Sequence, residues 1–320
     1  MSSDKCLVVG ATGGIGRATI KALVENGNQV RAFVRSKQKA EKYFSGMKNV
    51  EIFEGDAVKP ADLSKAIKGC SVLFYCANIS YLDWKEKARP LLQVSLDAAA
   101  NAKARFVFPG NVYIYGHAQY NPVDEKHPLA AHTVKGKIRI DMEEMIKKYS
   151  SEKGLQFTTV RFPDFYGPFV VNGFSEKAYQ NALIGKSLFW IGAKNIPLEY
   201  IFIEDAGKCL AAAGLSEKGI NHEFNVPATL PITNKSYMEL ISKSGGTNSK
   251  YQLLNSNFIF TLFGLFNKVI KEVYEMLYLK REELILDGAK FKNTFGFLPS
   301  TTYEEGVKKT FEWIKFFYKV

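Results

Sequence analysis

Short apolar runs alternate with amphipathic stretches through the first half of the chain. Apolar runs bounded by Gly, Pro or polar residues predict buried strands, and amphipathic stretches of helical period predict helices. The predicted strands are Lys5–Gly10, Gln29–Val34, Val50–Glu54, Ser71–Cys76, Arg105–Pro109 and Gln156–Arg161, with His222–Val226 as a seventh. The predicted helices are Gly14–Asn26, Ser36–Ser45, Ala61–Lys68, Trp84–Ala102 and Val134–Ser151. This alternation is typical of β-α-β units on a parallel sheet covered by helices on both faces.

The pattern changes after Arg161, where loops rich in Gly, Pro and aromatic residues (PDFYGPFVVNGF) alternate with short helices. We therefore predict an α/β protein: a doubly wound, parallel Rossmann sheet with a smaller, mixed and mainly helical C-terminal lobe. The predicted Rossmann domain spans residues 1–160 and is completed by about residues 200–226. Residues 161–199 and 227–320 are predicted to form the substrate-binding lobe.

The charge and cysteine patterns exclude several classes of function. The chain has 43 Lys+Arg against 32 Asp+Glu, a formal charge of +11, but its lysines are scattered singly. Scattered charge is typical of a solvated surface, so we predict no nucleic-acid partner. The cysteines Cys6, Cys70, Cys76 and Cys209 have no C-x-x-C spacing, and the histidines have no metal-like spacing, so no metal site is expected.

The chain has no predicted membrane span. Residues Met1–Lys5 are polar, unlike a signal peptide, and the most lipophilic stretch is Phe258–Phe266. That stretch is far shorter than the ~20 residues that a spanning helix needs. We expect this stretch to belong to the hydrophobic core, to line a hydrophobic pocket, to form a subunit contact or to rest on a membrane surface. The expected location is cytoplasmic.

Gly10, Gly13 and Gly16 lie between the first predicted strand and the first predicted helix, in the run VVGATGGIGRATI. Glycines at such a turn allow unusual φ, a close approach of the backbone to a pyrophosphate, and tight packing of helix on strand. The N-terminus of the helix also offers N–H donors to phosphate. The sequence therefore predicts a nicotinamide dinucleotide held by Gly10, Thr12, Gly13, Gly14, Ile15 and Gly16.

The end of the second strand indicates the form of the cofactor. An NAD site places Asp or Glu about 20 residues after the glycines to bind the ribose 2′-hydroxyl. This chain has Arg35 there, in VRAFVRS, and a guanidinium can bind a 2′-phosphate. We predict NADP(H), with NAD(H) as the alternative and with Arg17 as a further cation near the phosphate.

Two later strand ends supply further candidate contacts. Asp56, beside Ala57, either bonds the adenine amino group or caps the helix that begins near Pro60. Ala77 and Asn78 end the fourth strand, where the chain should pass over the cofactor.

In these features the chain resembles the short-chain dehydrogenase/reductase superfamily, in the extended and atypical branch that includes nucleotide-sugar epimerases and dehydratases. The resemblance covers nearly the whole chain. It rests on GATGGIG, the turn at Asp56, FVFPGNVYIYG, VRFPDFYGP, FIEDAGKCL, EFNV and FGFLPSTTYEEGVKKTFEW. It implies that Pro163 lies beside the nicotinamide and that helices Trp84–Ala102 and Val134–Ser151 pair two subunits in a homodimer.

The catalytic residues of the family are not matched. The family uses a Tyr that passes a proton, a Lys four residues later, and a Ser or Thr after the fifth strand. Here Asn111 stands at the hydroxyl position, and matching Gly136 and Glu143 to the family pattern puts Lys135 at the Tyr position and Arg139 at the Lys position. A second register pairs Thr133 with Lys137 but misplaces the glycine.

Three hypotheses follow for the function. In the first, the protein is an NADP(H)-dependent oxidoreductase or epimerase-like enzyme for a small carbonyl, quinone-like or sugar-nucleotide substrate. Lys135 beside Arg139 then acts as the acid and Asn111 holds the substrate oxygen, or a tyrosine acts from a loop, with Tyr113, Tyr115, Tyr81 and Tyr166 as candidates. In the second, the protein is a catalytically inactive NADP(H)-binding sensor or scaffold. In the third, an ordinary sugar-nucleotide enzyme carries its acid elsewhere in the chain.

Overall fold

Seven parallel strands form the central sheet, in the order β11-β6-β5-β4-β1-β2-β3. The computed structural model describes residues 5–170, 174–257, 260 and 272–319. The strands of the sheet are β1 (Lys5–Val9), β2 (Gln29–Val34), β3 (Val50–Glu54), β4 (Val72–Tyr75), β5 (Arg105–Asn111), β6 (Phe157–Phe162) and β11 (His222–Asn225). The strand order reverses direction beside β1, as in a doubly wound sheet. The predicted fold class is confirmed.

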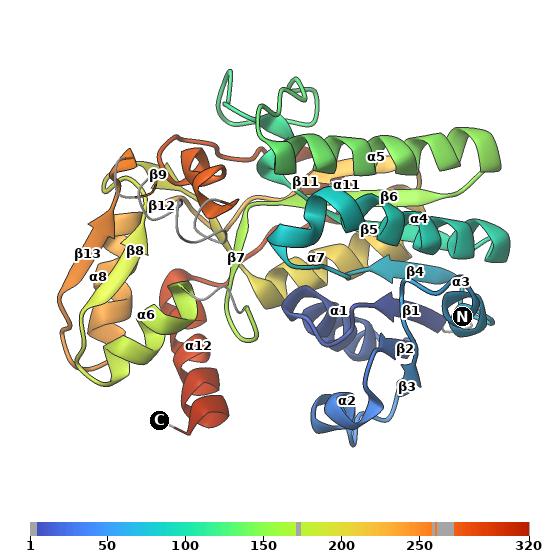
Figure 1. Cartoon of the computed structure of the whole chain (residues 1–320), viewed down its shortest axis with the longest axis horizontal. Coiled ribbons are helices and arrows are strands. Elements are labelled where there is room, and N and C mark those ends of the chain that lie inside the picture. Colours follow the sequence, from blue (N-terminus) through green and yellow to red (C-terminus); the bar gives the residue numbers. More distant parts are fainter. Residues whose placement is uncertain (1–4, 171–173, 258–259, 261–271, 320) are drawn as a thin grey trace.

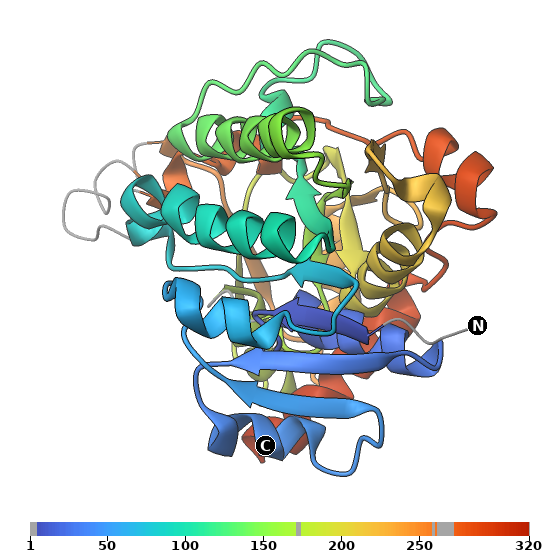
Figure 2. The ribbon, with the colours of Figure 1, turned by 90° about the vertical axis from the view of Figure 1, so that its right-hand side faces the viewer.

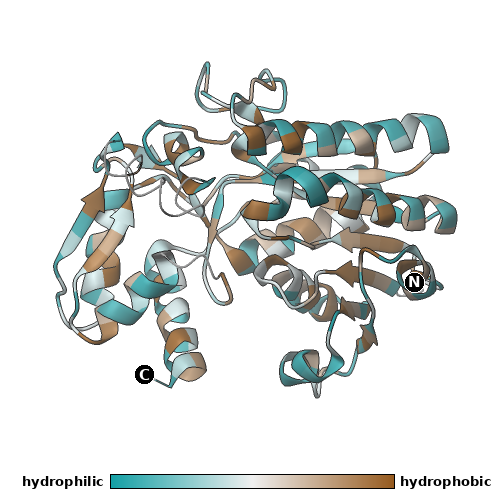
Figure 3. Cartoon of the chain, viewed as in Figure 1, coloured by the Kyte–Doolittle hydropathy of each residue, from teal (hydrophilic) through white to brown (hydrophobic). Residues whose placement is uncertain are grey.

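Helices cover both faces of this sheet (Figures 1 and 2). One face carries α1 (Gly14–Glu25), α2 (Lys37–Phe44) and α7 (Ile203–Leu215), and the other carries α3 (Pro60–Ala66), α4 (Trp84–Ala102) and α5 (Val134–Lys153). Because successive strand side chains point to opposite faces, Leu7 and Val9 of β1 pack under α3 to α5, whereas Cys6 and Val8 pack under α1 and α7. Strands β1 and β4 are accordingly mainly apolar (Figure 3).

A second lobe lies beyond the carboxyl edge of the sheet (Figure 1). Its helices are α6 (Phe174–Leu183), α8 (Asn234–Ser244) and α12 (Tyr303–Tyr318). Three two-stranded sheets accompany them: β7 (Asp164–Tyr166) with β10 (Tyr200–Phe202), β9 (Pro197–Leu198) with β12 (Ile232–Thr233), and β8 (Leu188–Ile191) with β13 (Tyr251–Leu254). The lobe is therefore mixed, as predicted, with more β-structure than its sequence pattern indicated.

Shorter elements complete the chain. They are the 3-10 turns η1 (Tyr81–Asp83), η2 (Val112–Tyr115), η3 (Glu217–Gly219) and η4 (Leu277–Lys280), and helix α11 (Ala289–Phe295). All four cysteines are buried, and none of them forms a disulfide bond. Of the lipophilic stretch Phe258–Phe266, only Phe260 lies within the described residues, and it is buried. None of the described helices combines the length and the apolar character needed to cross a membrane.

Glu199 connects distant segments of the chain at the border of the second lobe. This buried carboxylate, between β9 and β10, accepts hydrogen bonds from the backbone N–H of Ala228 at 3.0 Å and of Leu286 at 2.9 Å. Burial raises the pKa of Glu199 to about 8, in spite of these two bonds. Three separate passes of the chain therefore meet at one side chain.

A buried ion pair fixes α5 on the sheet. The Arg161 guanidinium of β6 donates from Nη2 to Oε2 of Glu143 on α5 at 2.6 Å, and both side chains are no more than 3% exposed. Nη1 also donates to the Tyr115 hydroxyl at 3.1 Å, which in turn donates to Oδ1 of Asn225 on β11 at 2.7 Å. Burial opposes the charge of Arg161, but Glu143 and Tyr115 raise its pKa overall. The pair sets the position of the whole helix, including the residues near its N-terminus.

Removing one partner of this pair should destabilise the fold strongly. We expect Glu143→Ala to lower the free energy of unfolding by about 3–5 kcal/mol, because it leaves a buried guanidinium without a counterion. Urea denaturation followed by circular dichroism measures the change. Glu152→Ala is the matched control, since Glu152 and Lys148 form an exposed pair on the same helix that should contribute about 0.5 kcal/mol or less. Equal losses in the two variants would contradict this assignment.

Candidate functional site

The glycine turn between β1 and α1 leaves no room for side chains at two positions. Gly10 has φ +82°, and a Cβ there would lie 2.6 Å from the backbone of Ala77. A Cβ on Gly16 would lie 2.3 Å from the carbonyl oxygen of Gly10. A Cβ on Gly13 would make only ordinary contacts, the nearest at 3.5 Å. Gly10 and Gly16 are therefore packed closely against backbone atoms, whereas Gly13 is exposed and has room for a methyl group.

The N-terminus of α1 has the properties of an anion site. Gly13 is the N-cap, no side chain caps the helix, and its first turn holds no acidic residue. The first N–H groups of a helix have no partner within the helix, and the helix dipole makes this end positive. Thr12 and Gly13 are exposed, and Gly14 and Ile15 are half-buried. The residues present thus fit the pyrophosphate of a dinucleotide.

Arg35 lies at the end of β2 as an exposed cation. In the described part of the chain it forms no hydrogen bond or ion pair. The next residue, Ser36, caps α2 through its hydroxyl, which accepts from the N–H of Lys39 at 3.4 Å. The guanidinium is therefore free to meet an added phosphate.

One use considered for Asp56 is wrong. Helix α3 begins at Pro60 with Lys59 as its N-cap and has no side-chain cap. The Asp56 carboxylate instead accepts from the N–H of Val58 at 3.2 Å, because its short side chain reaches the backbone two residues on. Asp56 is half-buried, as is Ala57 beside it.

A small cavity lies at the carboxyl end of β4. It brings together the predicted residues Ala77, Asn78 and Arg139. Its remaining lining residues are Tyr75, Ile79, Trp84, Ala88, Leu91 and Met142. Pro163, buried between β6 and β7, is not among them.

Arg139 is a half-buried cation without a counterion among the described residues. Its Nη1 reaches the Pro109 carbonyl at 3.5 Å, and its Nε is buried without a hydrogen-bond acceptor. The rings of Trp84 and Phe108 lie 5.0 and 5.3 Å from the guanidinium carbon. Burial lowers the pKa of Arg139, because the charged guanidinium is less stable away from water. Uncompensated charges of this kind concentrate at functional sites.

Lys135 lies in the first turn of α5 and is 1% exposed. Its ammonium forms ion pairs with Glu272 and with Glu275, the latter at 3.2 Å. Its backbone N–H also donates to the Glu275 carboxylate at 2.7 Å. Lys135 thus lies between two carboxylates, whereas the hypothesis of Lys135 as an acid relied on the neighbouring cation Arg139.

The structure also bears on the second register considered for α5. The Thr133 hydroxyl caps the helix by accepting from the N–H of Gly136 at 3.1 Å, and Lys137 is exposed. By contrast, Lys135 is buried and Arg139 is half-buried.

Two tyrosines form a hydrogen-bonded pair near these cations. The hydroxyls of Tyr81 and Tyr113 lie 2.8 Å apart, and the Lys135 ammonium lies 5.1 Å from the centre of the Tyr81 ring. The Asn111 side-chain oxygen accepts from the N–H of Tyr113 at 3.2 Å. Burial raises the pKa of both phenols, and the charge of Arg139 partly opposes this. Tyr115 and Tyr166 are instead held in buried contacts, Tyr115 with Arg161 and Tyr166 with the carbonyl of Thr302.

Sequence reasoning missed several residues that the fold brings to this place. Glu272 and Glu275 are three positions apart, a helical spacing that puts both on one face and could have indicated a shared partner. Lys280 pairs with Asp164 at 2.5 Å, and although burial opposes its charge, Asp164 and Tyr200 raise the pKa of Lys280 to about 12.

Two stacked histidines lie beside the same residues. The His117 and His132 rings are 4.1 Å apart, and Tyr278 packs against both. Burial and the neighbouring His117 lower the pKa of His132. No cluster of His, Cys, Asp and Glu within the described ranges has the arrangement of a metal site.

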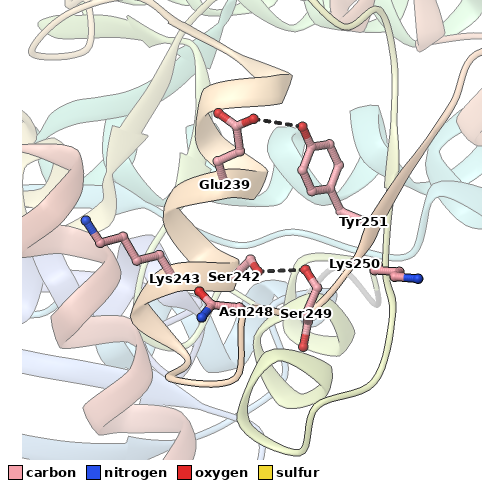
Figure 4. A pocket seen from close by; sticks show the side chains of 7 residues that line it. All are labelled: Glu239, Ser242, Lys243, Asn248, Ser249, Lys250 and Tyr251. Carbon is pink, nitrogen blue, oxygen red and sulfur yellow. Dashed lines mark hydrogen bonds between the residues drawn. The ribbon is translucent and has the colours of Figure 1, made fainter.

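A separate depression lies on the second lobe, between α8 and β13. Figure 4 shows Glu239 pointing toward the Tyr251 hydroxyl, which donates to its carboxylate at 3.0 Å. Ser242 donates to the carbonyl of Ser249 at 2.7 Å. None of the predicted site residues lines this depression.

The glycine turn and the strand order are those of a Rossmann-type protein. The chain belongs to the NAD dependent epimerase/dehydratase family, whose model matches residues 6–226. It is 23% identical to a UDP-N-acetyl-alpha-D-glucosaminuronate decarboxylase of Bacillus cytotoxicus, over 97% of this chain and 98% of that protein. It is 24% identical to the photosystem II assembly factor Ycf39 of Cyanophora paradoxa, over 76% of this chain and 70% of that protein.

Solved structures share the fold. A dTDP-glucose 4,6-dehydratase from Bacillus anthracis, in complex with NAD, aligns with a TM-score of 0.81 and 17% identity, over 98% of this chain and 97% of that chain. The predicted family resemblance is thus confirmed.

Alanine substitutions in the turn should separate folding from binding. We expect Gly16→Ala to lower the melting temperature and abolish dinucleotide binding, because its Cβ would overlap the Gly10 carbonyl. Gly13→Ala has room, so its melting temperature should stay unchanged. Its affinity should still fall about tenfold, because the added methyl stands where a phosphate approaches the backbone. Thermal unfolding and calorimetric titration with NADPH test both, and unchanged affinity in Gly13→Ala would place the phosphate elsewhere.

Proposed function

We propose that this protein binds NADP(H) at the glycine turn and acts as an oxidoreductase or epimerase-like enzyme on a small carbonyl, quinone-like or sugar-nucleotide compound. The observation that carries the proposal is the uncapped N-terminus of α1 together with the exposed, unpaired Arg35. The first offers donors to a pyrophosphate, and the second offers a cation to a 2′-phosphate. Among the substrates we favour a sugar nucleotide, because the relative from Bacillus cytotoxicus, which matches along nearly the whole chain, is a UDP-sugar decarboxylase.

The proposed cofactor contacts follow the carboxyl edge of the sheet. The residues of the turn hold the pyrophosphate, Asp56 and Ala57 meet the adenine, Ala77 and Asn78 lie along the dinucleotide, and Pro163 lies beside the nicotinamide. Arg139 binds the nicotinamide ribose, since its uncompensated guanidinium lines the cavity shared with Ala77 and Asn78. When bound, the nicotinamide supplies or accepts a hydride.

The remaining side chains handle the oxygen of the substrate. The Asn111 amide donates to that oxygen, because its own oxygen is already used by the N–H of Tyr113. The Tyr113 phenol is protonated at neutral pH, as phenols are, and can give its proton to an oxygen that gains negative charge. The Lys135 ammonium, paired with Glu272 and Glu275, lies beside the phenol pair. In this proposal Lys135 and Arg139 replace the Tyr and Lys of the family.

The molecular organisation follows from the same proposal. Residues 1–160, completed by about 200–226, hold the cofactor, and residues 161–199 and 227–320 form the substrate lobe. The family resemblance places α4 and α5 at the contact between two subunits of a homodimer.

A second candidate function is an inactive NADP(H)-binding sensor or scaffold. The ion pairs of Lys135 with Glu272 and Glu275 favour it, because they occupy the side chain at the position of the family tyrosine. The relative named as a photosystem II assembly factor also supports it.

Charge reversal at Arg35 should change the cofactor preference. We expect Arg35→Glu to weaken NADPH binding about 10- to 100-fold, since hydrogen bonds to charged groups contribute about 1.5–3 kcal/mol. NADH binding should change little, because NADH lacks the 2′-phosphate. Fluorescence titration with each cofactor measures the ratio. Lys42→Glu, an equal change of charge at an exposed position of α2, is the control, and equal losses for both cofactors in Arg35→Glu would contradict the NADP(H) assignment.

Turnover separates the two candidate functions. The protein should react with NADPH and at least one acceptor from a panel of quinones, aldehydes and sugar nucleotides, followed by absorbance and by NMR of the sugar products. Asn111→Ala should lower kcat about 100-fold or more, as expected for a donor to a developing oxyanion, with unchanged NADPH affinity. Asn248→Ala, in the depression between α8 and β13, is the matched control. NADPH binding without turnover of any acceptor would favour the sensor or scaffold.

A further inference from the structure

Arg17, near the start of α1, reaches back onto the glycine turn. Its Nε donates to the carbonyl oxygen of Thr12 at 2.8 Å. The direction is that of helical side chains in general, which tilt toward the N-terminus of their helix. Arg17 therefore touches the turn on its carbonyl side, whereas the N–H groups that would meet a phosphate belong to the start of the helix.

Two aromatic rings lie against the Arg17 guanidinium, with their planes 76° apart. Its carbon lies 3.1 Å from the centre of the Tyr43 ring and 3.9 Å from the centre of the Phe169 ring. Tyr43 belongs to α2 and Phe169 to the loop after β7, which has φ +64° at this residue. Phe169 in turn packs against Trp313 and Phe317 of α12. One side chain thus connects the glycine turn, α2 and the second lobe.

This position is costly for a cation. Arg17 is half-buried and has no carboxylate partner in the part of the chain that the structure describes. Burial lowers the pKa of Arg17, and Tyr43 only partly offsets this. Lys21, one turn later on the same helix, is exposed and paired with Glu204 at 2.8 Å. A cation on this helix can therefore lie exposed beside a carboxylate, as Lys21 does. Arg17 is instead held in a half-buried position by its contacts with Tyr43, Phe169 and Thr12.

The Phe169 loop also lies against the turn itself. A Cβ on Gly14, in the first turn of α1, would stand 3.1 Å from the Phe169 carbonyl oxygen. The turn is therefore enclosed by Phe169 on one side and by the Thr12–Arg17 bond behind it. Contacts from Arg17 and Phe169, in addition to the glycines, therefore border the turn.

We propose that Arg17 is a positioning residue for the pyrophosphate of the dinucleotide: it holds the Thr12 carbonyl away from the phosphates and keeps the glycine turn in its binding shape. This inference rests on the proposed function, because it needs a dinucleotide at the turn. It differs from the role of Arg35, which concerns the 2′-phosphate. Loss of Arg17 should consequently weaken NADH and NADPH by the same factor.

The experiment compares Arg17→Ala, Arg17→Lys and the control Lys21→Ala in the full-length protein. Dissociation constants for NADH and NADPH are measured by fluorescence titration, with and without millimolar ethylguanidinium chloride and with sodium chloride at equal ionic strength. We expect Arg17→Ala to weaken both cofactors about tenfold or more, with an unchanged ratio between them. Ethylguanidinium should restore affinity in Arg17→Ala by refilling the space between the two rings, and sodium chloride should not. Arg17→Lys should restore only part, because an ammonium lacks the Nε–H that donates to Thr12 and the planar guanidinium that contacts the two rings.

Three results would overturn the proposal: unchanged affinity in Arg17→Ala, a loss confined to NADPH, or a loss that ethylguanidinium does not reverse in a folded variant. A loss confined to NADPH would mean that Arg17 binds the 2′-phosphate directly. Failure of the unaltered protein to bind either cofactor would instead refute the proposed function, so the two failures are distinguishable.

A second variant covers the case in which Arg17→Ala does not fold. Phe169→Leu keeps Arg17 and its bond to Thr12 but removes one of the two rings. It should weaken both cofactors by a smaller, equal factor at temperatures well below its melting point. Unchanged affinity for both cofactors in folded Phe169→Leu would refute the role of the two rings.

Discussion

The close contact between backbones at the first turn is the constraint on which the rest of the structure depends. Gly16 sits on the Gly10 carbonyl, and Gly10 sits on Ala77, with no space for a Cβ at either contact. A third contact of this kind lies farther along α1, where a Cβ on Gly207 of α7 would be 2.4 Å from the Ala18 backbone. These contacts set the position of α1 on the sheet and against α7. They thereby fix its open N-terminus beside the end of β4, against Ala77.

Helix α5 shows how one element can carry charge in two different ways. Arg161 needs Glu143 of this helix as a counterion, and together they anchor it by a buried pair. Nearer its N-terminus, Lys135 forms ion pairs with Glu272 and Glu275, whereas Arg139 has no ion-pair partner among the described residues. The anchored end gives the other end a defined place. The neutralised Lys135 thus differs from Arg139, whose guanidinium lines the small cavity with Ala77 and Asn78.

The sequence predicted the parts of this molecule that depend on local pattern. All seven strands of the sheet were predicted to within about two residues, because apolar runs flanked by turns are typical of buried parallel strands. The glycine turn was predictable because its conformation needs glycine at Gly10. The register of Lys135 and Arg139 on α5 came from a family pattern; in the structure Lys135 is buried and Arg139 is half-buried.

Contacts between residues distant along the chain could not be predicted. The Tyr81–Tyr113 pair and the carboxylates that meet Lys135 depend on how loops and lobes fold back, which a period of helix or strand does not encode. The three small sheets were missed for the same reason, since strands of two to four residues are too short to show alternation. The ring contacts of Arg17 join segments from α1, α2 and the loop after β7.

The meeting of three chain passes at Glu199 has a consequence for how such a protein can change over evolutionary time. The polypeptide enters the second lobe with β7, returns to the sheet with α7 and β11, leaves again with β12, touches the sheet once more through Phe291 of α11, and ends in α12. Neither lobe is one continuous stretch, so a recombination event with a single crossover cannot transplant the second lobe onto another Rossmann half. Exchange of the whole lobe would need a crossover at each of these passages.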